Sequence, residues 1–528
     1  MTDMKSEILR AALTADDEIA LLDLREQGEF GACHLFWAVN TPLSRLEFEV
    51  ARLVPRLGTP IVVITAGDAD LAGRGAVALT DLGYSDVTIC PDTPDGWVAA
   101  GFTLYSGINV PSKAFGEAVE HHYGTPALHA SELKAMQDRG DDLVVLDSRT
   151  FAEYHNMNIP QGISVPGGEL AYRVRDLAPS EETLVVVNCA GRTRSILGAQ
   201  SVINAGIPNK VIALENGTMG WHLAGLELEH GRTDRFPSGD PESLDATIAM
   251  RDRIAAEHGV ETIDRARLAE WQSEAEGRTL YLLDVRDPDE FATGHLPGSR
   301  SAPGGQLVQA PDFQIGVPNG RIVLIDDTGV RATMTAHWLL QMGCRDVSVL
   351  DGGLTGELVT GADTDVQTAT TPTIAADALA ARLSDDDLAV LDLGESRVFR
   401  KGHVPGAQWA IRSRIAATGP ALPDTGTLVL TSDDGRCAAL AVEEAETLTN
   451  AEVLVLAGGT NAWVAAGQKT EADPTYPADE ACIDVYLRAY DRNTDVEARM
   501  QEYIDWEVAL IDQVAADDDV QFKMGPSA

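Results

Sequence analysis

A pattern of strand, loop and helix recurs four times along the 528 residues, and it constrains the fold more than any other feature. Each copy opens with a short apolar segment that ends in aspartate, and a second apolar segment follows about forty residues later. Because apolar β-branched strands that alternate with helices form parallel sheets covered on both faces, the sequence predicts an α/β fold of four tandem domains. The opening segments end at Asp23, Asp147, Asp284 and Asp392.

We expect four domains at residues 1–122, 123–240, 241–368 and 369–478, and we call them the first to fourth units. Residues 479–528 break the pattern. Helical patterns at 485–490 and 496–514 predict a C-terminal helical extension that packs on a neighbouring domain, with a flexible tail as the alternative.

The second unit differs from the others because a cysteine follows its second strand. The apolar run Val185–Asn188 precedes Cys189, and Ala190–Ser195 forms a loop that opens a helical segment. At such a place backbone N–H groups, the helix dipole and neighbouring cations favour an anion on sulfur. Counted from the opening aspartates, the same position in the other units is taken by Ala66, Asp327 and Ser432.

These features resemble the rhodanese-like sulfurtransferases. The resemblance is carried by Leu283–Arg286 with Glu290-Phe291 and Gly294–Gly298 in the third unit, by the Cys189 loop, and by closing Gly-Trp turns. It covers all four units but not the extension. It implies that each unit is a small parallel sheet with helices on both faces. It also implies that Cys189 carries a persulfide and that the other three units are inactive, serving to bury surface, frame the pocket or dock a partner.

The charge of the loop is opposite to that of the chain, which has 82 acidic and 40 basic residues and a net charge of −42. Cys189 is therefore the predicted nucleophile, in a loop suited to an anionic sulfur donor such as thiosulfate. Gly191 permits the loop to curl tightly. The residues predicted to bind the donor or the persulfide are Ala190, Gly191, Arg192, Thr193, Arg194, Ser195 and Arg173.

The acidic surface argues against nucleic acid or an anionic membrane as a partner. The sequence shows no secretory signal at its N-terminus and no apolar run long enough to span a membrane, so we expect a cytoplasmic protein. The six cysteines form no CxxC pair, and we expect free thiols with no metal site and no cofactor. Cys437 lies beside carboxylates in the fourth unit and is expected to be structural.

The favoured function is a thiosulfate sulfurtransferase that passes sulfur from the donor through Cys189 to a thiophilic acceptor, either a small thiol or a protein. Mercaptopyruvate remains an alternative donor. A non-enzymatic sulfur carrier or redox-sensing scaffold is the second hypothesis. A cysteine-dependent phosphatase or arsenate reductase is less favoured, because Cys189 and Arg194 follow a Cys-x4-Arg rather than a Cys-x5-Arg spacing.

Overall fold

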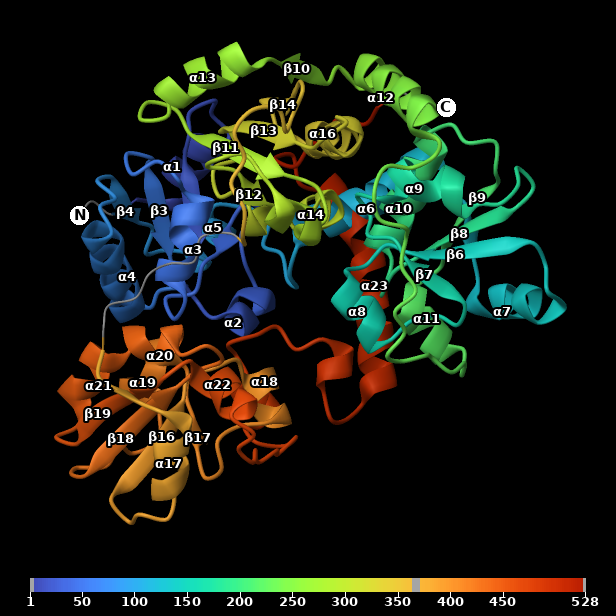
Figure 1. Ribbon diagram of the computed structural model, residues 1–528. Helices are drawn as coiled ribbons and strands as arrows, with labels where there is room; N and C mark the ends of the chain where they lie inside the picture. The colour runs from blue at the N-terminus through green and yellow to red at the C-terminus, as the bar shows by residue number, and fades with distance from the viewer. Residues whose placement is uncertain (1–3, 363–370, 526–528) are drawn as a thin grey trace.

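The computed structural model describes residues 4–362 and 371–525, and these residues form four separate parallel sheets (Figure 1). The strands of each sheet come from a single predicted unit, while the expected boundary at 368 lies outside the described residues. The first sheet has the order β2 (Val39–Asn40), β1 (Ala20–Asp23), β3 (Ile61–Ile64), β4 (Val87–Ile89). The second has the order β5 (Ala127–Leu128), β9 (Val211–Leu214), β8 (Leu184–Asn188), β6 (Leu143–Asp147), β7 (Gly162–Ser164). The third has the order β10 (Glu261–Ile263), β14 (Val347–Leu350), β13 (Arg321–Ile325), β11 (Leu280–Asp284), β12 (Arg300–Ser301). The fourth has the order β15 (Thr373–Ile374), β19 (Glu452–Leu456), β18 (Thr427–Thr431), β16 (Leu388–Asp392), β17 (Gln408–Trp409).

Helices connect the strands in every unit, so the expected α/β fold of tandem units is confirmed. Those of the first unit are α1 (Ser6–Leu13), α2 (Gln27–Ala32), α3 (Leu46–Leu53), α4 (Ala69–Asp81), α5 (Asp95–Ala99) and α6 (Val110–Tyr123). The second unit contains α7 (Ala130–Arg139), α8 (Phe151–Asn156), α9 (Leu170–Leu177), α10 (Thr193–Asn204) and α11 (Gly217–Leu223). The third contains α12 (Leu244–His258), α13 (Arg265–Ser273), α14 (Pro288–Thr293), α15 (Gly304–Gln309) and α16 (Val330–Met342). The fourth contains α17 (Ala376–Arg382), α18 (Ser396–Lys401), α19 (Ile415–Thr418), α20 (Arg436–Leu440), α21 (Val442–Leu448) and α22 (Gly459–Ala465), and α23 (Val496–Ala515) follows it.

Alternating residues of the central strand β8 pack on opposite faces of the second sheet. Val185 and Val187 belong to the core that includes residues of α9 and α10. Leu184 and Val186 belong to a separate core that includes residues of α7 and α11. Because both faces of the sheet are buried, the first four residues of β8 are apolar. The fifth, Asn188, is polar and donates a hydrogen bond within the fold. The carboxyl end of β8 is thereby held rigidly where the loop with Cys189 begins.

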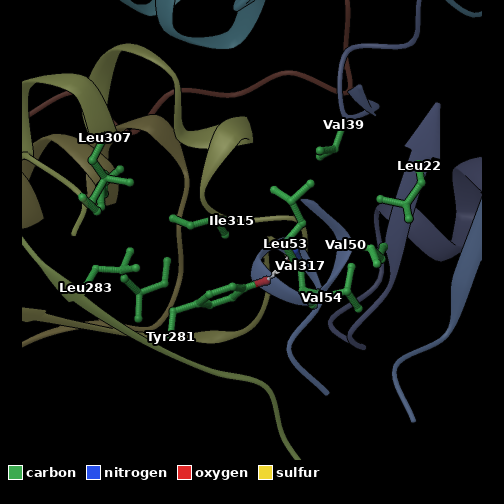
Figure 2. Packing of buried hydrophobic residues seen from close by; sticks show 14 of the residues in the cluster. Leu22, Val39, Val50, Leu53, Val54, Tyr281, Leu283, Leu307, Ile315 and Val317 are labelled. Atoms are coloured by element: carbon green, nitrogen blue, oxygen red, sulfur yellow. Dashed lines mark hydrogen bonds between the residues drawn. The ribbon is translucent and has the colours of Figure 1, made fainter. Parts of the chain in front are cut away.

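The first and third units share one hydrophobic core and are not independently packed. Leu53 of α3 and Tyr281 of β11 both belong to it, and Figure 2 shows the Tyr281 ring reaching from the third sheet toward α3. The Tyr281 hydroxyl donates a hydrogen bond to the carbonyl of Leu53 at 2.5 Å and accepts one from the Val317 N–H at 3.0 Å. The sequence repeat alone predicts four separate cores, so this fused core is a finding of the structure.

The sheet registers correct two of the predicted equivalents of Cys189. Asp147 is paired with Asn188, which places Cys189 one residue beyond the strand pair. Asp23 is paired with Ile64 and Asp284 with Ile325, so the equivalent residues are Thr65 and Asp326 rather than Ala66 and Asp327. In these two units, counting from the opening aspartate goes one residue past the position that the strand pairing gives. The prediction of Ser432 agrees with the pairing of Asp392 and Thr431.

The C-terminal extension ends in the helix α23, which runs through the middle of the molecule beside α6 (Figure 1). The predicted helix at 485–490 is wrong, since this segment has only a short 3-10 turn at Ala489–Asp491. Its backbone bonds to the first unit instead: the Gly28 N–H donates to the Ile483 carbonyl, and the Tyr486 N–H donates to the side chain of Gln27. Among the described residues, none of the helices is long and apolar enough to cross a membrane.

The shared core predicts that a cavity made in α3 will loosen two sheets at once. Leu53 is 1% exposed, and truncating it in Leu53→Ala should cost about 2–5 kcal/mol of stability. Hydrogen exchange followed by mass spectrometry should then rise in peptides from both β1–β4 and β11–β14. The matched control Leu57→Ala removes a side chain that is 51% exposed and should change little. Faster exchange confined to the first sheet would contradict the shared core.

Candidate active site

Cys189 lies directly after the central strand β8 and is only 2% exposed. A buried polar network fixes the strand end beneath it. The Asn188 side chain donates to Asp147 at 2.9 Å, and Asp147 forms an ion pair with Arg149 at 2.7 Å. Arg149 also donates to the carbonyl of Met157, so it ties the strand to the connection that follows α8. Asp147 and Arg149 therefore form a buried, bidentate pair that organises the unit.

A turn at residues 216–221, here called the closing turn, holds the backbone of the cysteine loop from the other side. The Thr218 N–H donates to the Cys189 carbonyl at 2.8 Å, and the Met219 N–H donates to the Ala190 carbonyl at 3.0 Å. Gly217 has φ +53°, and a Cβ there would lie 2.2 Å from the Cys189 carbonyl oxygen. Only glycine permits this approach, and Trp221 anchors the turn as a fully buried packing residue.

The loop after Cys189 leads straight into α10, whose first residue is Thr193. The Ser195 hydroxyl lies 3.1 Å from the Cys189 sulfur and can donate to it. The Thr193 hydroxyl instead donates to Glu507, from α23. A small cavity of ≈ 50 Å³ opens beside the sulfur, and it is lined by every predicted loop residue from Cys189 to Arg194. The first turn of α10 thus faces the same space as the thiol, which suits an anion at that point.

Both loop arginines are already bound to carboxylates from other elements. Arg192 donates to Glu117 at 2.7 and 2.8 Å and also to Glu120, both on α6. Arg194 forms a bidentate pair with Glu153 of α8, with both contacts at 2.8 Å. Burial alone raises the pKa of Glu153, but the Arg194 guanidinium outweighs it and holds that pKa well below its usual range. The guanidinium groups therefore fix the loop through these carboxylates, although both arginines also line the cavity.

Several residues that line the cavity lie outside the second unit and are absent from the sequence prediction. Lys113 comes from α6, Gln309 is the last residue of α15, and Tyr503 and Glu507 come from α23. The Lys113 ammonium donates to the Tyr503 hydroxyl and lies 3.6 Å from a Glu507 carboxylate oxygen. No short-range motif marks these residues, because they reach the loop only through the packing of distant segments. Further lining residues are Ile108, Asn109, Met219, Tyr486, Arg488 and Ala489.

The structure does not bring Arg173 to this cavity. Arg173 lies on α9, where it pairs with Glu169 at 3.0 Å and packs on the ring of Phe236. It is 3% exposed and supports the joint between α9 and the segment that contains Gly239. Cys437 lies in the first turn of α20, just after the corresponding loop of the fourth unit, and burial above all raises the pKa of its thiol to about 11. Burial, more than the neighbouring carboxylates that the sequence suggested, keeps this thiol uncharged.

Comparisons with known proteins agree with the repeat and the loop. Three stretches of the chain, residues 129–224, 265–356 and 375–466, match the family of the rhodanese-like domain. A crystal structure of a thiosulfate sulfurtransferase from Pseudomonas aeruginosa is similar over 100% of both chains, with 45% identity and a TM-score of 0.91. The thiosulfate sulfurtransferase GlpE of Pseudoalteromonas translucida is 27% identical over 77 residues, which cover 14% of this chain and 70% of that protein. The uncharacterised protein YqhL of Bacillus subtilis is 34% identical over 87 residues, which cover 16% of this chain and 67% of that protein.

The Glu153–Arg194 pair predicts a pH-dependent contribution to stability. Because the folded-state pKa of Glu153 is lowered, the pair stabilises the fold above about pH 4.3 and loses its effect only as the pH falls toward the lowered value. Glu153→Gln should therefore cost about 1–3 kcal/mol at pH 7, measured by thermal unfolding, and the difference from wild type should shrink in strong acid. Glu181→Gln, at an exposed site in the same unit, is the control. A deficit that persists unchanged in acid would contradict this assignment.

Proposed function

Because this chain belongs to the rhodanese-like domain family, we propose that it is a sulfurtransferase in which Cys189 carries a sulfane sulfur as a persulfide. The observation that carries the proposal is a thiol at the end of a central parallel strand, facing a small cavity beside the first turn of a helix. The full-length similarity to a thiosulfate sulfurtransferase supports the same activity and makes thiosulfate the favoured donor. The acceptor is a thiol, free or on a protein.

In the first half-reaction the Cys189 thiolate attacks the outer sulfur of the donor. With thiosulfate, a bond forms between Cys189 Sγ and that sulfur while the bond to the sulfonate sulfur breaks, and sulfite leaves with the electron pair. The Ser195 hydroxyl, 3.1 Å from Sγ, donates to the sulfur anion. Lys113 and Arg488 line the same cavity, and their positive charge attracts the donor's sulfonate group. The loop arginines contribute indirectly, because they hold the loop in place through their ion pairs with Glu117 and Glu153.

The other three units do not carry sulfur in this proposal. Thr65, Asp326 and Ser432 stand where the second unit has Cys189, and none of these side chains can form a persulfide. The first and third units instead supply walls of the cavity, through Lys113 and Gln309. This arrangement favours catalysis at a single centre within the four units that the sequence predicts.

Replacing the proposed nucleophile gives the direct test. In Cys189→Ser, thiosulfate sulfurtransferase activity should fall by more than about 10³-fold, since no other group can take the sulfur. Intact-mass spectrometry of the wild-type chain after incubation with thiosulfate should show the addition of one sulfur atom, located on the peptide with Cys189, and the variant should show none. Parallel incubation with mercaptopyruvate identifies the preferred donor.

Cys437→Ser is the matched control, because Cys437 lies in the helix that directly follows the equivalent loop of the fourth unit. It should load sulfur and turn over like the wild type. Equal activity in wild type and Cys189→Ser, or sulfur found on Cys437 instead, would overturn the proposal. A persulfide on Cys189 with no transfer to any small acceptor would favour a sulfur carrier over an enzyme.

A further inference from the structure

The C-terminal helix α23 places a fully buried carboxylate, that of Glu507, in the wall of the Cys189 cavity. Glu507 is 0% exposed and comes from a segment outside the four repeated units. A buried carboxylate is costly unless hydrogen bonds or cations compensate it. The contacts of its two oxygens therefore indicate why it is there.

The two carboxylate oxygens of Glu507 have different surroundings. Oε1 accepts hydrogen bonds from the Thr193 N–H at 3.3 Å and from the Thr193 hydroxyl, and it lies 3.6 Å from the Lys113 ammonium. Oε2 is buried and accepts no hydrogen bond from any described residue. A Cβ built on Gly191 would lie 3.4 Å from Oε2, so this oxygen lies against the bare backbone of the cysteine loop.

The different contacts of Oε1 and Oε2 distinguish a structural role of Glu507 from a chemical one. Capping the first turn of α10 needs only Oε1, which Thr193 already occupies. An unpaired buried acceptor is unfavourable, so Oε2 calls for a hydrogen-bond donor that comes with a ligand. The cavity of ≈ 50 Å³ has room for the slender end of a molecule, such as a terminal –CH₂–SH group, beside the sulfur of Cys189. A thiol S–H is the donor that the second half-reaction brings to this place.

We propose that Glu507 is a catalytic residue for the sulfur acceptor, relaying the proton of a neutral primary thiol through Oε2 while the thiol takes the sulfane sulfur from Cys189. This inference rests on the proposed function, because it requires a persulfide on Cys189. It commits the acceptor to a neutral, unbranched thiol, because only an acceptor that brings a proton can use Oε2 as the proton acceptor.

With this proton relay, the bonds, electrons and proton of the sulfur transfer are all accounted for. Oε2 takes the proton from the acceptor R–SH, and the resulting thiolate attacks the outer sulfur of the persulfide anion. The bond between Cys189 Sγ and the outer sulfur breaks, its electron pair stays on Sγ as the thiolate, and Glu507 returns the proton to the outer sulfur. The products are R–S–SH and the Cys189 thiolate, with the acceptor sulfur oxidised and Sγ reduced. Because the outer sulfur gains a proton as its bond to Sγ breaks, the build-up of negative charge on both neighbouring sulfurs is avoided.

Single-turnover transfer from preloaded full-length protein tests this role. The persulfide form is mixed either with 2-mercaptoethanol, a neutral thiol, or with sulfite at a pH where it is fully ionised and has no proton to give. In Glu507→Gln the amide oxygen still accepts from Thr193 but cannot take a proton. The ratio of the thiol rate to the sulfite rate should fall about 10²-fold relative to wild type. Glu502→Gln, an exposed site on the same helix, should leave that ratio unchanged.

The wild-type chain alone supplies a second readout if the variant folds poorly. With Glu507 as proton acceptor, the thiol rate should depend only weakly on pH below the thiol's own pKa; without it, the rate should follow the thiolate fraction and rise tenfold per pH unit. An unchanged ratio in a folded Glu507→Gln, or a wild-type rate that tracks the thiolate fraction, would overturn the inference. Absence of any persulfide on wild-type Cys189 would instead overturn the proposed function, so the two failures are distinguishable.

Discussion

The hydrogen bond from the Thr218 N–H to the Cys189 carbonyl is the contact on which the rest of the site depends. It brings the closing turn so near to the end of β8 that no side chain fits at position 217. The same contact recurs in the fourth unit, where the Thr460 N–H donates to the Ser432 carbonyl at 2.9 Å, and Gly459 makes the matching close approach. The backbone cradle is thus common to units with and without the cysteine. What differs between them is the side chain that the cradle presents.

The ion pairs around the loop are also repeated without the thiol. In the third unit Arg331, at the position of Arg194, binds Glu290, which is at the position of Glu153. Arg331 is fully buried and serves a loop that starts at Asp326, where no persulfide can form. A cation that pairs in the same way in a silent unit acts first as a support for the loop. In a chain of net charge −42, carboxylates are abundant enough to pair with each such arginine. Lys113 and Arg488 add two further cations to the lining of the cavity.

The sequence predicts the parts of this site that depend on local order, and it misses those that depend on packing between distant segments. The apolar run before Cys189 and the repeated order of strand, loop and helix suffice to place Cys189 at the end of a buried strand, and the loop residues 190–194 line the cavity beside it. The prediction that Arg173 binds the donor rests on its charge alone, and the sequence does not show that Arg173 pairs with Glu169 instead of reaching the cavity. Nor does any pattern at 485–490 reveal that its backbone groups bond to Gln27 and Gly28 rather than to a helix.

The composition of the cavity gives a physical reason for the presence of the three units that lack the loop cysteine. Lys113 lies on α6, which packs between α10 and α23. This helix follows the sheet of the first unit, and that sheet shares its core with the third unit. Gln309 enters from the third unit, while the fourth unit leads the chain into the extension that carries Tyr503 and Glu507. A second unit standing alone would keep Cys189 and its cradle but lose Lys113, Gln309, Tyr503 and Glu507. The cysteine loop therefore belongs to one unit, while the lining of its cavity requires the whole chain.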